Sequence, residues 1–201
     1  ANGKPGEIKA MGLDLKRSDT PKVVQDFLQS VLVGVLTGHG RDEALEEITA
    51  FRKEFRSWPG WEKGSPKRAN NITNHAKNLE AMERATMGKA TGKKVTIPGH
   101  VLASLNWNKL KKIYNDNYSM PIQDGQKVIV CKLRPNPSGL NSVAYPTDEM
   151  KLPQWFRELP FDHDAMEEAL IDKKLDNLLG VLNWRINEHK NNTSFDDLFA
   201  F

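Results

Sequence analysis

The 201-residue sequence has little cysteine, no long apolar run and no complete catalytic motif. Its single cysteine, Cys131, has no partner for an internal disulfide, so we expect a reducing compartment, the cytoplasm of a cell. No apolar run approaches the ~20 residues of a membrane span. No signal-peptide pattern opens the chain, and we expect no membrane partner. The five histidines are scattered without another His or Cys at metal-ligand spacing, which predicts no metal site.

The glycine-containing segment 88–94 resembles a phosphate-binding loop, but it is one residue short and lacks the Ser/Thr that holds magnesium. We interpret it as a flexible basic loop that carries Lys93 and Lys94. The sequence has no glycine-flanked serine elbow and no obvious carboxylate pair for two-metal phosphoryl transfer. It therefore indicates a binding protein without catalytic residues of its own.

Charge is strongly segregated behind a net charge of only +3. Residues 63–112 contain eleven Lys and Arg against Glu80 and Glu83, a net charge of +9. Residues 158–201 contain ten Asp and Glu against four Lys and Arg, a net charge of −6. A positive field that local carboxylates do not cancel attracts a polyanion, most often a phosphate backbone. The alternative is a solvated basic surface without a partner.

Two stretches concentrate side chains that suit nucleic-acid binding. Residues 67–71 offer two cations and two amides, predicted to lie in one turn, and residues 100–112 place hydroxyl, amide and ammonium donors along one helix. Trp107 either stacks on a base or belongs to the core, which is the commoner role. Lys132 and Arg134 extend the same surface or are simply solvated. The candidate contact residues are Lys67, Arg68, Asn70, Asn71, Lys93, Lys94, His100, Ser104, Asn106, Asn108, Lys109, Lys111, Lys112, Lys132 and Arg134.

The predicted fold class is α+β, mainly helical. It comprises an antiparallel helix pair, a long C-terminal helix, a small β-hairpin and an N-terminal strand over 7–15. The pair runs from Pro21, with Thr20 as a cap, to Gly38, and from about 42 to 58. Its first helix has a wide apolar face that includes Val23 and Leu36. Residues 59–98 are predicted to form loops and brief helical turns, with a short helix from Ala76 to Met87 as the alternative.

Further along the chain, residues 99–114 are predicted to form a helix with a kink or break near 106–108, where the apolar face shifts. A strand over 127–134 and a return strand near 143–145 flank a turn at 136–139. The last helix is predicted to begin near Asp164, with Glu167 completing a capping box.

The C-terminal residues combine aromatic and acidic side chains after a polar stretch. Phe195, Leu198, Phe199 and Phe201 surround the pair Asp196-Asp197. Exposed aromatics cost free energy in water, so this tail either packs back on its own domain or docks in a partner's pocket. The acidic pair favours docking, because it keeps the free tail soluble and suits a basic rim.

Several motifs in order resemble the thumb region, with the end of the palm, of a family B DNA polymerase of T-even-type bacteriophages. The resemblance rests on residues 9–13 and 18–25, on 69–72, and on His100 with Leu105-Asn106-Trp107-Asn108. It continues through residues 125–128, 133–139 and 144–146 and ends in the tail 194–201. No single motif is decisive, but their order and spacing together are fairly specific.

The resemblance implies three parts: the end of the palm at 1–17, a duplex-binding thumb at 18–190, and a clamp-docking tail at 191–201. It implies duplex contacts at Lys67, Arg68, Asn70, Asn71, His100, Asn106, Asn108 and Lys109, and sliding-clamp contacts at Phe195, Leu198, Phe199 and Phe201. An N-terminal polymerase chain is expected to contain the exonuclease, the fingers and the palm. Its palm aspartates are expected to hold two magnesium ions. This chain, a split subunit or an excised fragment, is then inactive alone and works in the cytoplasm of an infected bacterium.

Two other interpretations stay open. The chain is a free-standing DNA-binding or clamp-interacting accessory protein, which binds duplex tightly alone with strong salt dependence. Or it is a structural module with an incidental basic face, which does not bind DNA.

Overall fold

The computed structural model describes residues 17–86 and 96–181. The chain divides into two compact units, residues 1–56 with 168–201 and residues 57–167. The described residues confirm the predicted class, since helices dominate and one three-stranded antiparallel sheet is present. The predicted strand at 7–15, the basic loop with Lys93 and Lys94, and the tail 191–201 lie outside these residues. None of the described helices is long and apolar enough to cross a bilayer.

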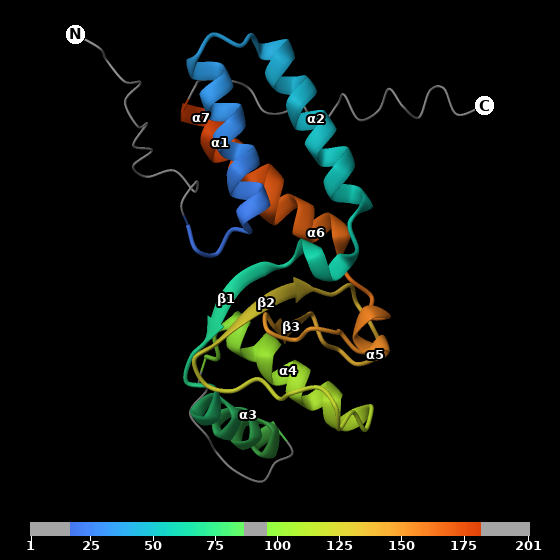
Figure 1. Ribbon diagram of the computed structural model, residues 1–201. Coiled ribbons are helices and arrows are strands. Elements are labelled where there is room, and N and C mark those ends of the chain that lie inside the picture. Colours follow the sequence, from blue (N-terminus) through green and yellow to red (C-terminus); the bar gives the residue numbers. More distant parts are fainter. Residues whose placement is uncertain (1–16, 87–95, 182–201) are drawn as a thin grey trace. The chain divides into compact units, whose positions relative to one another are not determined.

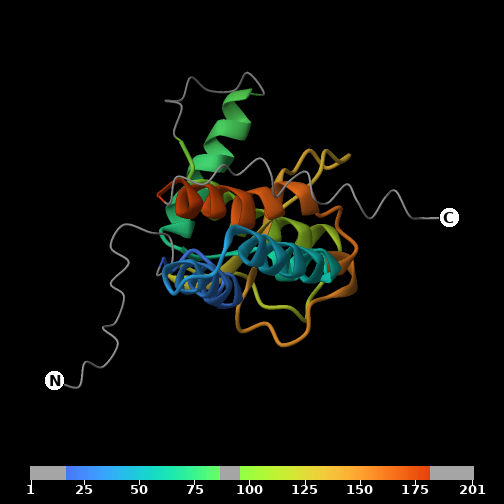
Figure 2. The same ribbon diagram turned by 90° about the horizontal axis from the view of Figure 1, so that it is seen from above.

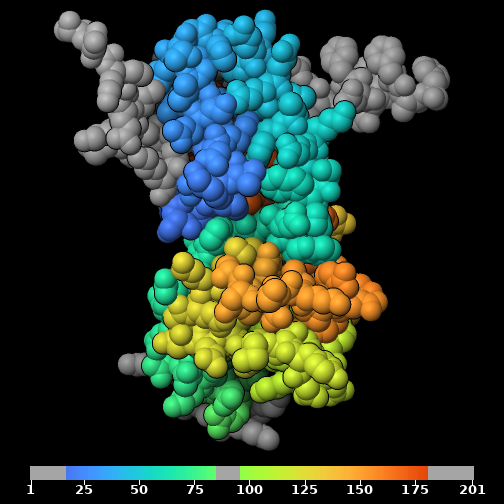
Figure 3. Space-filling model, viewed as in Figure 1, coloured from blue at the N-terminus to red at the C-terminus, as the bar shows by residue number. Residues whose placement is uncertain are grey.

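The first unit contains the predicted antiparallel helix pair, α1 (Lys22–Leu36) and α2 (Arg41–Ser57). The short connection 37–40 reverses the chain between them, and the rings of Phe27 and Phe51 stack across the pair with centroids 3.9 Å apart. A π-helical turn (Glu168–Asp172) leads into α7 (Lys173–Val181), which packs against α1. Figures 1 and 2 agree on this three-helix arrangement, and Figure 3 shows α1 and α2 side by side. Their apolar faces form the core of this unit.

The start and the apolar face of α1 differ from prediction. Pro21 is itself the N-cap and no side chain caps the helix. The hydroxyl of Thr20 is buried without a hydrogen-bond partner in the described part of the chain, while Gln25 Nε2 donates to Thr20 O at 2.8 Å. Val23 and Leu36 are 51% and 53% exposed, so the buried stripe is narrower than expected. The helix end is as predicted, with Gly38 in the left-handed region at φ 104°.

An ion pair stabilises the interior of this unit. Arg52 of α2 is only 3% exposed. Its Nη2 donates to Asp172 Oδ1 of the π-helical turn at 2.8 Å. A buried guanidinium needs such a partner, because an unpaired charge in the interior is costly.

The second unit is built on a sheet of order β1-β2-β3, formed by β1 (Ser65–Ala69), β2 (Gln126–Lys132) and β3 (Ser142–Pro146). The remaining elements are a 3-10 turn (Gly60–Lys63), α3 (Ile72–Thr86), α4 (Gly99–Ile113), α5 (Gln154–Arg157) and α6 (His163–Glu167). Helix α4 packs on the sheet, mainly on β3 (Figure 1). The fully buried Trp107, Phe156, Val128, Cys131 and Val143 belong to one core cluster. The β2–β3 pairing confirms the predicted hairpin.

The prediction of loops and brief helical turns over 59–98 agrees with the 3-10 turn at Gly60–Lys63 but is wrong for residues 65–69 and 72–86. Residues 65–69 pair with β2, Ser65 opposite Val130 and Ala69 opposite Gln126, and a 15-residue helix begins at Ile72. A short strand with Pro66 in it carries almost no local signal, and it forms because β2 supplies its hydrogen bonds. The helix packs against α4, and its residues from 73 to 84 are half-buried or exposed.

Helix α4 is continuous from Gly99 to Ile113, so the predicted break near 106–108 is wrong. The apolar period shifts there because this stretch is buried on several sides, with Leu105, Asn106 and Trp107 each 9% exposed or less. Trp107 is a core residue, as its commoner role predicted: it is 0% exposed and its Nε1 donates to Met120 O at 2.9 Å. A buried indole that has a carbonyl partner does not disturb the helix.

The C-terminal helical segment also departs from prediction in detail. Its cap is Asp162, whose Oδ1 accepts from Ala165 N at 3.0 Å, two residues before the expected start at Asp164. The segment then passes through the π-helical turn between α6 and α7. The boundary between the two units falls at this turn, between Glu167 and Glu168.

Candidate nucleic-acid interface

Lys67 and Arg68 lie in strand β1, not in a turn as predicted, so their side chains leave opposite faces of the sheet. β1 is an edge strand in the described sheet, and both side chains flank the same edge. Arg68 is exposed, stands directly opposite Lys127 and donates from Nη1 to Gly125 O at 2.9 Å. Two cations facing each other across a ladder repel, and an anion between them would remove that cost.

Lys67, His75 and His100 form a basic cluster drawn from β1, α3 and α4. The pKa of His100 is lowered below its ordinary value by burial, by Lys67 and by His75, in decreasing order. His75 Nδ1 is buried and has no hydrogen-bond partner among the described residues. A group whose charged form is opposed by neighbouring cations gains from an added anion, so this cluster favours phosphate.

Asn70 and Asn71 mark the start of α3 and are both exposed. Asn71 adopts φ 59°, a conformation that asparagine tolerates better than most residues, and its Oδ1 accepts from Asn74 Nδ2 at 2.6 Å. The first amide of α3, Ile72 N, donates to Asp124 Oδ1 at 2.9 Å. By contrast, no side chain of the described residues caps α4 at Pro98. Val101 N already donates to Pro98 O, so the amides of Gly99 and His100 are the ones open to an anion there.

Four of the predicted contact residues on α4 are engaged inside the protein and do not form a binding surface. Ser104 is 0% exposed and donates to His100 O at 2.8 Å, and Asn106 is 4% exposed and donates to Ser142 O at 2.8 Å. Both amide atoms of Asn108 pair with the backbone of Ile122, at 3.0 and 2.8 Å. Lys111 is 9% exposed and donates to Asp116 O. These four side chains therefore hold α4 to itself, to β3 and to the connection after α4, and are not placed as nucleic-acid contacts.

The other predicted cations divide into two groups. Lys109 is exposed on α4 and reaches Glu83 of α3 at 3.8 Å, and Lys112 is exposed one turn further on. Lys132 and Arg134 are exposed at the opposite end of β2 from Lys127. There Lys132 donates to Ala165 O at 3.5 Å. The pKa of His163 is lowered by burial first, then by the nearby charges of Lys63 and Arg134. Most of the length of β2 therefore lies between this pair and Lys127.

We use the name β1–α3–α4 surface for Lys67, Arg68, Asn70, Asn71, His75, His100 and Lys109. Sequence reasoning missed His75 and Lys127, which the structure adds near the predicted residues. Recognition of α3 from Ile72 would have placed His75 one turn after Asn71. In the described part of the chain no group of three or more His, Cys, Asp or Glu could hold a metal ion.

No protein-family model matches the chain. A DNA-directed DNA polymerase of Enterobacteria phage T4 is 28% identical over 141 residues. The match covers 70% of this chain but only 14% of that polymerase. The chain is therefore distantly related to a phage DNA-directed DNA polymerase and spans a small part of its length.

Proposed function

We propose that this chain acts as the thumb of a phage DNA polymerase and holds the primer–template duplex by its backbone. The observation that carries the proposal is the cluster of Lys67, His75 and His100 beside the uncapped start of α4. Cations and helix amides recognise phosphate oxygens without reading bases, as a polymerase that copies every sequence requires. The distant similarity to a phage polymerase supports this choice over a generic basic surface.

In this proposal catalysis takes place elsewhere in the polymerase. The exonuclease, the fingers and the palm, whose aspartates hold two magnesium ions, belong to a catalytic portion outside residues 1–201. Residues 1–17 complete the palm, and residues 18–190 serve as the thumb. The tail 191–201 docks on a sliding clamp through Phe195, Leu198, Phe199 and Phe201, with Asp196 and Asp197 facing a basic rim. By this proposal the chain works in the cytoplasm of the infected cell.

The test is primer extension with the catalytic polymerase portion from the same source. Adding this chain is expected to raise the amount of extended primer about tenfold, which corresponds to roughly 1.4 kcal/mol of additional binding free energy for DNA. Deleting residues 194–201 is expected to abolish the long products that depend on the clamp and to spare short extension without it. No gain on adding the intact chain would contradict the thumb role. Unchanged long products from the truncated chain would show that the tail packs on its own domain.

A further inference from the structure

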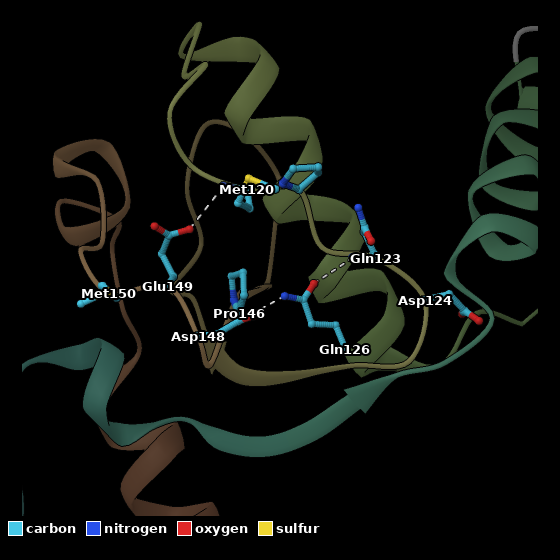
Figure 4. Close-up of a pocket in the computed structure, with 9 residues that line it drawn as sticks. Met120, Gln123, Asp124, Gln126, Pro146, Asp148, Glu149 and Met150 are labelled. Atoms are coloured by element: carbon cyan, nitrogen blue, oxygen red, sulfur yellow. Dashed lines mark hydrogen bonds between the residues drawn. The ribbon is translucent and has the colours of Figure 1, made fainter.

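A pocket of about 520 Å³ in the second unit carries the opposite charge from the β1–α3–α4 surface. It lies between the α4–β2 connection and the turn after β3 (Figure 4). No Lys or Arg is among its lining residues, which are Met120, Pro121, Gln123, Asp124, Gln126, Pro146, Asp148, Glu149 and Met150. Lys127 and Lys151 follow lining residues in sequence without lining the pocket themselves. A phosphate backbone is repelled here, so the pocket lies outside the proposed DNA contact.

Two exposed methionines lie at the rim of this pocket. Met120 is 60% exposed and Met150 is 101% exposed. Methionine side chains are flexible and polarizable, and they adapt to bulky apolar partners. Together they offer an apolar contact area on either side of a hollow, which a partner with bulky apolar side chains can cover.

Two carboxylates of this pocket, Asp148 and Glu149, each have one oxygen without a hydrogen bond within the described residues. Glu149 Oε2 accepts from Met120 N at 3.3 Å and points toward Met120 (Figure 4), while its Oε1 has no hydrogen bond within the described residues. Asp148 Oδ1 accepts from Gln126 Nε2 at 2.9 Å, and Oδ2 likewise has none there. At the far end of the pocket, Asp124 Oδ1 accepts a hydrogen bond from Ile72 N. Asp148 and Glu149 are therefore the side chains placed to receive an ammonium or guanidinium group.

We propose that this pocket docks a peptide segment of a partner protein in which Lys or Arg alternates with bulky apolar residues. The free oxygens of Asp148 and Glu149 accept from the cations, and Met120 and Met150 cover the apolar side chains. A bare metal ion does not fit, because the described residues lack any metal-holding group of three ligands. The proposal is independent of the thumb role, since it needs neither DNA nor a clamp.

The experiment uses the full 201-residue chain with ¹³C-methyl methionine and a short amidated peptide of two lysines alternating with two leucines among glycines and serines. We expect the peptide to shift the methyl signals of Met120 and Met150 and to leave that of Met166, only 3% exposed, unchanged. A peptide with glutamate for lysine, and one with serine for leucine, are expected not to bind. A short DNA duplex is expected to leave both exposed methionines unperturbed.

Variants separate docking from a folding effect. Met150→Ser changes a side chain with no packing to lose and is expected to weaken the peptide severalfold. Asp148→Asn with Glu149→Gln is expected to weaken it about five- to tenfold, the effect of removing two exposed charge pairs. Asp164→Asn, an exposed carboxylate on α6, serves as the control and should change nothing. The proposal is overturned if no peptide binds at millimolar concentration, if the variants bind as the wild type does, or if duplex DNA shifts Met120 and Met150.

Discussion

Replacing Trp107 with alanine is expected to lower the free energy of unfolding by about 3–5 kcal/mol. The indole is fully buried, lies 5.2 Å from the rings of both Trp155 and Phe156, and donates to Met120 O. The substitution leaves a cavity and an unpaired carbonyl in the same place, and the surrounding rings belong to short elements that cannot close over it.

The measurement is urea unfolding followed by far-UV circular dichroism, with Tyr118→Ala as the matched control. Tyr118 lies in the loop after α4 and is 97% exposed, so its loss is expected to change stability by less than about 0.5 kcal/mol. Equal effects of the two substitutions would show that Trp107 is not a core residue. In that case its role as a base-stacking platform would have to be considered again.

Replacing Asp116 with asparagine is expected to lower the free energy of unfolding by about 2–4 kcal/mol at neutral pH. Hydrogen bonds to a charged group contribute more to stability than hydrogen bonds between neutral groups. Its carboxylate accepts from Tyr118 N at 2.9 Å, Ser119 N at 3.0 Å, Ser119 Oγ at 2.6 Å and Trp155 Nε1 at 2.9 Å. Its backbone oxygen accepts from Lys111. Asp116 therefore ties the end of α4, the following loop and α5 together, and an amide cannot accept all these bonds.

The same carboxylate makes stability depend on pH in a defined direction. Burial acts to raise the pKa of Asp116, but the bonds from Ser119, Trp155 and Tyr118 outweigh it and hold the pKa well below its ordinary value. A lowered pKa in the folded state contributes stability that is complete above the unfolded value of about 3.9. That contribution is lost as the pH falls toward the folded value.

This pH dependence is measured by chemical unfolding of the wild type and of Asp116→Asn at pH 7 and near pH 3. The gap in unfolding free energy between wild type and Asp116→Asn is expected to shrink as the pH falls, because the wild type alone loses the contribution of the ionised carboxylate. A gap that stays constant would mean that the hydrogen bonds do not depend on ionisation.

The sequence predicts the elements that depend on local signals and misses those made by long-range pairing. The antiparallel pair α1–α2 has a clear apolar period and a glycine stop, and both appear as expected. β1 is a five-residue strand that forms only because β2, some sixty residues later, pairs with it. No local pattern of residues 65–69 distinguishes this strand from a loop.

In the candidate site, the sequence also does not show which polar side chains are already used inside the protein. Asn106 and Asn108 bind the backbone of Ser142 and Ile122 with the same amide groups that would contact phosphate. The sequence shows that an amide donor is present on α4 but not which acceptor it meets. An asparagine that binds the protein's own backbone therefore cannot be told from one that binds nucleic acid. Lys67 and Arg68 are predicted as contacts, yet their grouping with His75 depends on the first turn of α3, which lies before the short helix that the sequence allows at 76–87.

The most direct test of the account is the affinity of the full chain for a duplex of about 20 base pairs, measured by fluorescence anisotropy over a range of salt concentrations. Binding is expected to weaken steeply with salt and to be nearly independent of base sequence. Replacing Lys67, Arg68 and Lys109 with alanine is expected to lower the log–log salt slope by about 3, whereas Lys22→Ala with Lys53→Ala, outside the β1–α3–α4 surface, leaves it nearly unchanged. Salt-independent binding, a strong sequence preference, or equal effects of the two sets would contradict the claim that this surface holds the duplex.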